Sequence, residues 1–481
     1  MGFLPLISVN AWKEFVIMPI YRSFAQFTKG ASHIKHGLGC QDFAACHDHY
    51  ADEKLAVAIV ADGHGSPQYF RSDTGSSKAV EQAMSGIKAF VANTVFTAEN
   101  ISNAEIYDKL RRLASSIIGS WKEAVEADEK SRPLKDDKNT LTLEDKYRKR
   151  YLKDDPVPEH IHHAYGTTLI AVAVTENYWF GLHVGDGKCE VLFENGQWAQ
   201  PIPWDQKCFL NSTTSICDDN ALFEFRYWFG YRDLNGAVFE FAYGPDCDGI
   251  DSARKSGTKP VAIFIGSDGV DDTYPVHENE KHLKYLYRTV VLSFSKDGFE
   301  STKNQIKGLA EKLAEQGSQD DVSMAGIVVE KFDEEFIARL SDQHELDKVR
   351  EKAIFARQKE EAKKNSFQAE QARAEKLKKQ QAELENKAQA AKQDLEQKNA
   401  HLSHLQKGSI KLRIEEATKS VEDASANVEK IQTELESIDV EAGIQQEKVN
   451  IAEAEWKKAD DEAAQLEEQC RSLELKSQTA L

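Results

Sequence analysis

Short apolar runs alternate with polar turns over the first two thirds of the chain. The clearest run covers residues 55–61, seven apolar residues in succession that end at an Asp-Gly pair. Runs of this length, rich in β-branched residues and bounded by Gly or Asp, predict buried strands. The same pattern predicts further strands at residues 167–174, 178–184, 189–193, 261–266 and 324–329.

Longer segments repeat their apolar residues with helical spacing. This spacing predicts helices at residues 74–91, 106–128, 280–294 and 301–314.

The order of the predicted elements indicates the fold class. Several strands follow one another without a helix between them, which argues against a doubly wound parallel sheet and favours an α+β fold with mostly antiparallel strands. Residues 130–158 are highly charged and contain three prolines, so we expect a solvated excursion there.

The pattern changes near residue 332, beyond which Ala, Glu, Gln, Lys and Leu dominate and proline is absent. Apolar residues recur there at seven-residue steps, and such heptads predict a coiled coil. A weaker heptad pattern precedes the stronger one, and the two registers do not connect across residues 406–409. A turn at this point would give a helical hairpin, and one continuous rod is the alternative. The strongest heptad positions are Ile414, Val421, Val428 and Leu435.

An apolar seam of this kind needs a partner, because an isolated helix gains little stability by itself. The partner lies either in the same chain, as an intramolecular hairpin, or in another copy, as self-association. We therefore divide the chain into an N-terminal extension (residues 1–27), a folded domain (28–332) and a coiled-coil tail (333–481).

Charge and composition exclude several classes of protein. The chain has 61 basic and 80 acidic residues and a formal net charge of −19, which argues against a nucleic-acid binder. No apolar run approaches the roughly 20 residues that span a bilayer, so we expect no membrane partner. Seven cysteines without regular spacing favour reduced thiols and a cytoplasmic location.

Acidic residues beside glycine follow several of the predicted strands. Asp62 ends the first strand and is followed by Gly63 and His64, while Asp268 and Asp320 lie at the ends of later strands. Mg²⁺ and Mn²⁺ prefer oxygen ligands in octahedral array, and one segment can rarely surround such an ion alone. A His beside a metal-binding carboxylate can protonate a leaving oxygen. The pattern therefore indicates a metal-dependent hydrolase.

Together these segments resemble the ordered motifs of the PP2C-type metal-dependent protein Ser/Thr phosphatases. The resemblance covers about residues 28–330, and residues 30–42 resemble the divergent bacterial branch of that family. It implies a β-sandwich of two antiparallel sheets flanked by helices. The motifs are Asp62-Gly63-His64-Gly65, Gly166-Thr167-Thr168-Leu169, Val184-Gly185-Asp186-Gly187, Ser267-Asp268-Gly269-Val270 and Asp320-Asp321-Val322-Ser323.

The resemblance also implies a centre of two Mn²⁺ or Mg²⁺ ions that activate a water for attack on phosphorus. Asp62 would bridge the ions, the Gly63 carbonyl would bind one, and Asp268 and Asp320 would complete the ligand set. Asp186 would match a ligand of a third, weaker ion. His64 would be the general acid that protonates the leaving Ser or Thr oxygen.

Two positions depart from the family pattern. Gln41-Asp42 stands where a Glu-Asp pair is usual, and Gln41 is a weaker metal ligand than Glu. Gly37 stands where many members have an Arg that contacts phosphate. The basic residues nearby that could replace this Arg are His33, Lys35 and His36, although a solvated basic loop is the simpler explanation for all three.

Two functions remain open from the sequence. The first is an active Ser/Thr phosphatase of phosphoproteins, with a cognate Ser/Thr kinase as a logical partner and a coiled-coil module for assembly. The second is a catalytically weak protein of the same fold that binds phosphoproteins or nucleotides and acts as a scaffold. The presence of Asp62, Asp268, Asp320 and His64 together favours the first.

Overall fold

The structure is a computed structural model of residues 1–481. It describes residues 19–99, 101–153, 156–208, 212–233, 235–246, 257–275, 278–407 and 411–479. The chain divides into two units, Met1–Ser341 and Asp342–Leu481. None of the described helices is long and apolar enough to cross a membrane.

The first unit contains two antiparallel sheets that face each other. One sheet has the strand order β1 (Tyr21–Thr28), β11 (Val322–Val329), β10 (Pro260–Gly266), β6 (Lys188–Phe193) and β7 (Trp198–Ala199). The other has the order β2 (Phe43–Asp48), β3 (Leu55–Ala61), β4 (Leu169–Thr175), β5 (Tyr178–Val184), β8 (Arg226–Arg232) and β9 (Val238–Tyr243).

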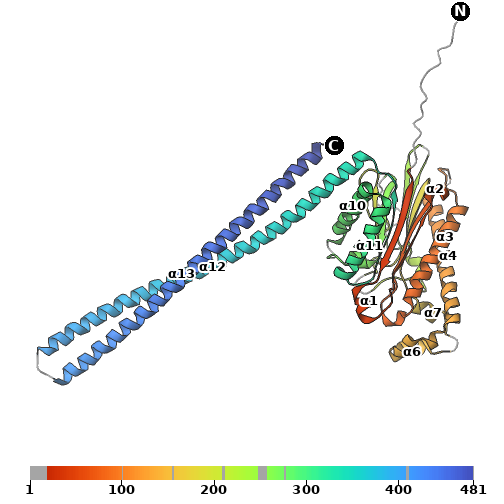
Figure 1. The fold of residues 1–481 in the computed structure, drawn as a ribbon. Helices are drawn as coiled ribbons and strands as arrows, with labels where there is room; N and C mark the ends of the chain where they lie inside the picture. The colour runs from red at the N-terminus through yellow and green to blue at the C-terminus, as the bar shows by residue number, and fades with distance from the viewer. Residues whose placement is uncertain are drawn as a thin grey trace, which may run out of the picture. The chain divides into compact units, whose positions relative to one another are not determined.

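Helix pairs cover the outer faces of both sheets (Figure 1). The helices α3 (Ser72–Asn93) and α4 (Asn103–Ser131) pack on the six-stranded sheet, and α10 (Asn279–Asp297) and α11 (Phe299–Gln316) pack on the five-stranded sheet. This arrangement confirms the predicted α+β sandwich of two antiparallel sheets flanked by helices.

Strand β3 shows why its sequence is apolar at every position. Val57 and Ile59 pack in the core beneath α3 and α4, whereas Ala58 and Val60 pack between the two sheets. All seven residues of β3 are buried, so the period-two alternation typical of a half-exposed strand is absent.

Shorter elements connect these layers, and most lie near strand ends. They are α1 (Ala31–His36), α2 (Tyr50–Glu53), η1 (Pro67–Tyr69), η2 (Leu134–Asp136), α5 (Lys138–Thr142), α6 (Asp145–Tyr151), α7 (Pro158–Ala164), α8 (Ala221–Glu224) and α9 (Asp268–Asp271).

All six predicted strands and all four predicted helices are present, with ends that differ by three residues or fewer. Two expectations differ from the structure. Strand β1 begins at Tyr21 and pairs with β11 along its whole length, from Tyr21 opposite Val329 to Thr28 opposite Val322, so the sheet already includes residues assigned to the N-terminal extension. The charged segment at 130–158 is not simply solvated, because its apolar side chains Leu134 and Tyr151 are fully buried in the core under α4.

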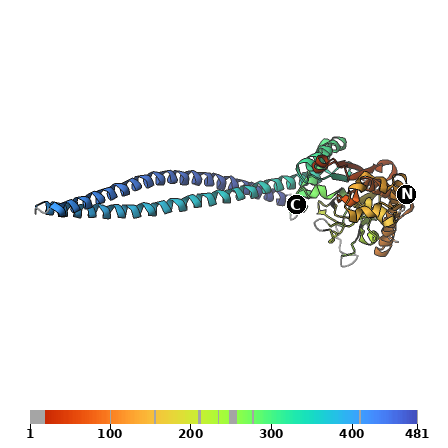
Figure 2. The same cartoon turned by 90° about the horizontal axis from the view of Figure 1, so that it is seen from below.

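The second unit consists of two long helices that run side by side (Figures 1 and 2). Helix α12 (Glu334–Gln406) enters it from the first unit, and α13 (Lys411–Thr479) returns along it. Arg350 pairs with Glu474, Lys363 with Glu455 and Gln381 with Asp439, so the helices are antiparallel. The hairpin alternative therefore describes this chain, and residues 408 and 409 of its predicted turn lie outside the described residues.

The side chains buried between these helices recur at the heptad positions read from the sequence. Val449 and Ala463 are buried, and the ring of Trp456 stacks on Phe367 with centroids 5.5 Å apart. Gln445 is the polar exception, because its buried side-chain amide donates to the carboxylate of Glu370 at 2.6 Å. The seam thus follows the predicted heptads, with one buried amide that is hydrogen-bonded.

Candidate active site

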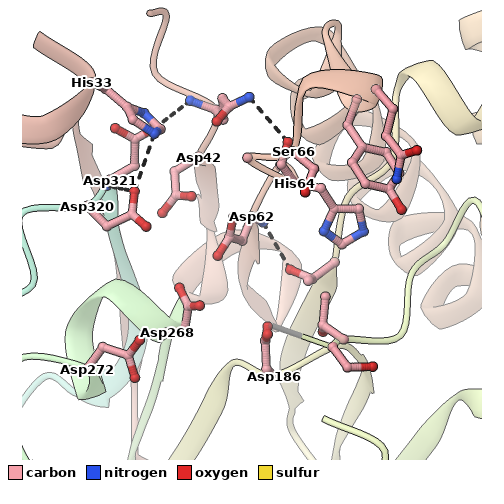
Figure 3. Close-up of a pocket in the computed structure, with 18 residues that line it drawn as sticks. His33, Asp42, Asp62, His64, Ser66, Asp186, Asp268, Asp272, Asp320 and Asp321 are labelled. Atoms are coloured by element: carbon pink, nitrogen blue, oxygen red, sulfur yellow. Dashed lines mark hydrogen bonds and ion pairs between the residues drawn. The ribbon is translucent and has the colours of Figure 1, made fainter. Parts of the chain in front are cut away.

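A pocket of about 550 Å³ opens where the ends of strands from both sheets meet (Figure 3). Carboxylates dominate its lining, and the lining residues that the structure describes include no Lys or Arg. Such a surface attracts cations and repels a phosphate unless cations occupy it first. The seven carboxylates are those of Asp42, Asp62, Asp186, Asp268, Asp272, Asp320 and Asp321.

The backbone around Asp62 is held from both sides. Its carbonyl accepts a hydrogen bond from the Thr168 N–H (2.8 Å), and its own N–H donates to the Thr168 hydroxyl (3.1 Å). The next N–H, that of Gly63, donates to the Gln41 carbonyl (3.1 Å). A Cβ at position 63 would lie 2.7 Å from that carbonyl oxygen, so only glycine fits there.

Three carboxylates from distant segments converge on one point. Asp62 follows β3, Asp186 follows β5, and Asp268 begins α9 after β10; one oxygen from each lies within 4.8 Å of the other two. Burial, together with the neighbouring carboxylates, raises the pKa of each of the three above its usual range. Crowded hard oxygen donors that repel one another fit a divalent cation, which would relieve that repulsion.

A second group contains His33, Asp320 and Asp321. The His33 ring lies 2.9 Å from the Asp321 carboxylate and 3.5 Å from that of Asp320. The Asp321 carboxylate also accepts hydrogen bonds from the N–H groups of Gly30 (2.7 Å) and Gln41 (2.6 Å). Burial opposes ionisation of Asp321, but the close contact with His33 and the hydrogen bonds from Gly30 and Gln41 outweigh it and lower its pKa.

The two neighbouring aspartates therefore differ in their surroundings. Asp321 is buried and its hydrogen bonds fix the loop, whereas the Asp320 side chain is 59% exposed and lines the pocket. Asp320 is the more exposed carboxylate of this pair, and its Oδ1 accepts a hydrogen bond from the Asp321 N–H (2.8 Å). Asp320 belongs to a different group of side chains from Asp62, Asp186 and Asp268. The expected metal ligands therefore do not all lie together, because Asp320 lies apart from Asp62 and Asp268.

Asp42 connects the site to the loops behind it. Its buried carboxylate accepts hydrogen bonds from the hydroxyls of Ser267 (2.8 Å) and Ser323 (2.7 Å). Ser267 immediately precedes Asp268, and Ser323 follows the Asp320-Asp321 pair. Burial raises the Asp42 pKa to about 7 despite these two bonds. Asp42 therefore ties together the two loops that present Asp268 and Asp320.

Gln41, at the position usually occupied by Glu, is held by its amide nitrogen. Nε2 donates to the Ser72 hydroxyl (2.7 Å) and to the His64 carbonyl (3.3 Å). Its buried Oε1 has no hydrogen-bond partner among the described residues and belongs to the pocket lining. A buried acceptor left without a donor costs free energy, and a water or cation in the pocket would satisfy it.

His64 lies at the edge of the pocket beside a short aromatic stack. Its ring packs against Tyr69 (centroids 4.7 Å apart), and Tyr69 packs in turn against His163 (4.5 Å). The backbone N–H of His64 donates to the Gly166 carbonyl (3.1 Å). Burial, and to a smaller extent the nearby His163, lowers the His64 pKa to about 4, so the ring is neutral at pH 7 in this state.

The structure separates the three basic residues proposed to replace the missing arginine. His33 lines the pocket, but Asp320 and Asp321 engage its ring. Lys35 and His36 are exposed on α1 and do not line the pocket. Phosphate contact by Lys35 or His36 would therefore require a substrate that extends beyond the pocket described here.

Sequence reasoning missed three features of this site. Asp272 lines the pocket one turn beyond Asp268, Asp42 links two loops, and Asp321 fixes the His33 loop. The spacing of Asp268 and Asp272 on consecutive turns was the one available signal for Asp272. No local pattern could reveal the partners of Asp42 and Asp321, which lie more than 200 residues away in sequence.

Comparison with known proteins identifies the family. The family model described as protein phosphatase 2C matches residues 29–316, which is more than half of the 481 residues. The chain belongs to the protein phosphatase 2C family. At the level of its family the protein is thus a protein serine/threonine phosphatase, as the motif order predicted. No curated protein sequence matches the chain.

Solved structures of low sequence identity also resemble this phosphatase. The S. agalactiae serine/threonine phosphatase is 16% identical over 64% of this chain and 100% of its own, with a TM-score of 0.32. The catalytic domain of PstP, solved with two manganese ions, is 13% identical over 64% of this chain and 98% of its own, with a TM-score of 0.32. PppA of Pseudomonas aeruginosa is 14% identical over 65% of this chain and 99% of its own, with a TM-score of 0.33.

Proposed function

We propose that the protein hydrolyses phosphoserine and phosphothreonine in protein substrates with the help of two divalent cations, Mn²⁺ or Mg²⁺. The observation that carries this proposal is the convergence of Asp62, Asp186 and Asp268 within 4.8 Å at one end of the sandwich, beside His64. Membership of the protein phosphatase 2C family supports the same reaction.

The residues present fit a pair of hard cations. The donors are carboxylate oxygens, and Gly63 and Gln41 belong to the same lining. The buried Oε1 of Gln41 has no hydrogen-bond partner among the described residues. We assign Asp62 as the bridging ligand, with Gly63, Asp268 and Asp320 as further ligands and Asp186 as the ligand of a third ion. When bound, the cations would lower the pKa of a shared water and offset charge on the phosphoryl oxygens.

The protein groups in this scheme have separate tasks. Asp62, Asp268 and Asp320 position the ions, while Asp42 and Asp321 hold the loops that carry those ligands. His64 is the proposed general acid for the leaving Ser or Thr oxygen. Its ring is neutral in the free site, and the negative charge of a bound phosphate favours the protonated form.

The absence of Lys and Arg from the described pocket lining favours a second candidate, a weak enzyme that mainly binds phosphoproteins or nucleotides. In that case the carboxylates would hold cations that bridge to phosphate without turnover. A Ser/Thr kinase would supply the phosphorylated substrate in either case. Turnover is the measurement that distinguishes these candidates.

The test is phosphate release from a phosphoserine peptide by the full chain with Mn²⁺, with Mg²⁺ and with EDTA. We expect metal-dependent turnover that EDTA abolishes and that Asp268→Asn reduces by at least 10²-fold. Asp108→Asn, an exposed change on α4 outside the pocket, is the matched control and should leave turnover unchanged. Metal-dependent binding of the peptide without phosphate release would favour the second candidate.

A further inference from the structure

A second cavity, of about 1,030 Å³, lies in the first unit at the opposite ends of the strands that reach the active site. Tyr21 at the start of β1, Pro260 at the start of β10 and Val329 at the end of β11 all line it. The other ends of β10 and β11 lead directly to Asp268 and Asp321. The two cavities are therefore separated by the length of the sandwich, and the second is large enough for a small organic ligand.

Lys259 is the unusual residue of this cavity, because it is a lining lysine that is only 4% exposed. Within the described part of the chain, its ammonium donates to one acceptor, the Glu176 carbonyl (3.2 Å), and forms no ion pair. Its ammonium also lies 5.2 Å from the centre of the Tyr21 ring. A buried ammonium of this kind is costly unless a counter-ion accompanies it.

Glu194, one of two carboxylates whose charge acts on Lys259, already has other hydrogen-bond partners. Glu194 accepts from the Arg232 guanidinium (3.2 Å) and from the backbone N–H of Lys259 (3.3 Å). Burial, and then the positive charge of Arg232, lowers the Lys259 pKa to about 8. The charges of Glu194 and Glu176 partly offset this lowering of the pKa, so the side chain remains mostly protonated at pH 7, although no described carboxylate forms an ion pair with it.

The remaining lining supplies apolar surface beside these charges. Phe332 and Phe336 stack on each other (centroids 6.4 Å apart), and Val261 and Val329 continue the apolar wall. Arg232 also lines the cavity; its side chain is 38% exposed and forms an ion pair with Glu194. The lining also contains the basic residues Lys331 and Arg339 and the acidic residues Glu176, Glu194, Asp233 and Asp333. The cavity thus places Lys259 and Arg232 beside an aromatic and aliphatic wall, in a lining whose four basic and four acidic side chains balance in number.

We propose that this cavity binds a small organic anion, with its carboxylate, sulfonate or phosphate on Lys259 and Arg232 and its apolar body against Phe332 and Phe336. The ligand would provide the counter-ion that the described residues do not give to Lys259. This site is distinct from the active site and does not depend on the proposed phosphatase reaction.

Anilinonaphthalene sulfonate is a suitable probe, because it carries an anionic group on an aromatic body and a phosphatase cannot hydrolyse it. Fluorescence titration of the full chain at pH 7 should show a saturable site. Lys259→Gln should weaken that site about tenfold or more, since a charge-assisted hydrogen bond is lost, while Lys259→Arg should keep most of the affinity. The matched control is Lys307→Gln, an exposed lysine of α11 that does not line the cavity, and it should bind like wild type.

The uncharged analogue N-phenylnaphthylamine separates anion recognition from general apolar binding. We expect it to bind wild type and Lys259→Gln equally. Equal affinity of the sulfonate for wild type and a folded Lys259→Gln chain would overturn the proposal, as would the absence of a saturable site in wild type. If circular dichroism shows that Lys259→Gln does not fold, Arg232→Gln replaces it. A loss of threefold or more in that variant supports the site, and unchanged affinity overturns it.

Discussion

Gly30 shows how closely the backbone is packed behind the proposed ligand Asp320. Its N–H donates to the Asp321 carboxylate (2.7 Å), and a Cβ at this position would overlap the carbonyl carbon of Asp320. Gly30→Ala should therefore displace the Asp320 loop without disturbing the core. We expect the Mn²⁺ concentration for half-maximal activity to rise roughly tenfold, the size of effect typical of groups that support metal ligands.

A matched glycine change is available on α11. A Cβ at Gly308 would contact nothing within 4 Å, so Gly308→Ala should leave the metal requirement unchanged and stabilise the helix by up to about 1 kcal/mol. Metal titrations of activity for the two variants make the comparison. The same metal requirement in both would contradict the proposed role of the Asp320 loop.

The role of His64 can be tested through the leaving group. If His64 is the general acid, His64→Gln should lower turnover on a phosphoserine peptide by about 10²-fold or more. The loss should be much smaller on an aryl phosphate, because a phenolate leaves readily without a proton. Steady-state rates on both substrates decide the matter. Losses of equal size would show that His64 supports metal binding or structure instead.

At the scale of single residues, the sequence predicted the pocket residues that are marked by a short local motif. Asp62, Asp186 and Asp268 each adjoin a glycine at a strand end, and the structure brings these three together. Asp42 and Asp321 act through partners that are close only after folding, so no spacing rule identifies them. Metal binding by the predicted ligands stays a prediction at this scale.

At the scale of elements, the strands with the clearest apolar runs were predictable, whereas β1 and β2 were not. β3 and β5 are buried at every position and their ends were predicted without error. β2 and β1 carry polar residues such as His47, Asp48 and Arg22 within the strand, and their place in the sheet depends on pairing with distant strands. Local sequence does not encode that pairing.

The start of α12 gives a prediction about the limit of the folded unit. Phe336 and Leu340 are each 7% exposed and pack against the core beneath α10 and α11. A chain that ends at residue 341 should therefore keep the thermal stability of the phosphatase unit. A chain that ends at residue 332 should lose about 1.5–3 kcal/mol for each of these two side chains. Equal midpoints of thermal unfolding for the two chains would contradict this packing.

At the scale of the whole molecule, we expect the tail to decide whether the protein assembles. The seam between α12 and α13 is filled within one chain, so we expect a monomer in solution. Ile431→Asp with Leu435→Asp places two charges in this seam and should unfold much of the tail, with lower helicity and unchanged molecular mass. Light scattering together with circular dichroism measures both quantities.

The control for this tail variant makes the same two substitutions to Asp on the exposed face of α13. Val440 and Ile444 are also four residues apart but are 66% and 52% exposed, so Val440→Asp with Ile444→Asp should leave helicity unchanged. A mass that falls by half in the seam variant would mean that the seam joins two chains. Unchanged mass and helicity in the seam variant would contradict the heptad interpretation.

The central claim is a centre of two cations bridged by Asp62, and a calorimetric Mn²⁺ titration of the full chain tests it most directly. The wild-type protein should bind at least two Mn²⁺ ions per chain. Asp62→Asn should lose both of these sites while circular dichroism shows an unchanged fold, because one carboxylate serves both ions. Two Mn²⁺ ions bound by Asp62→Asn with wild-type affinity would contradict the account.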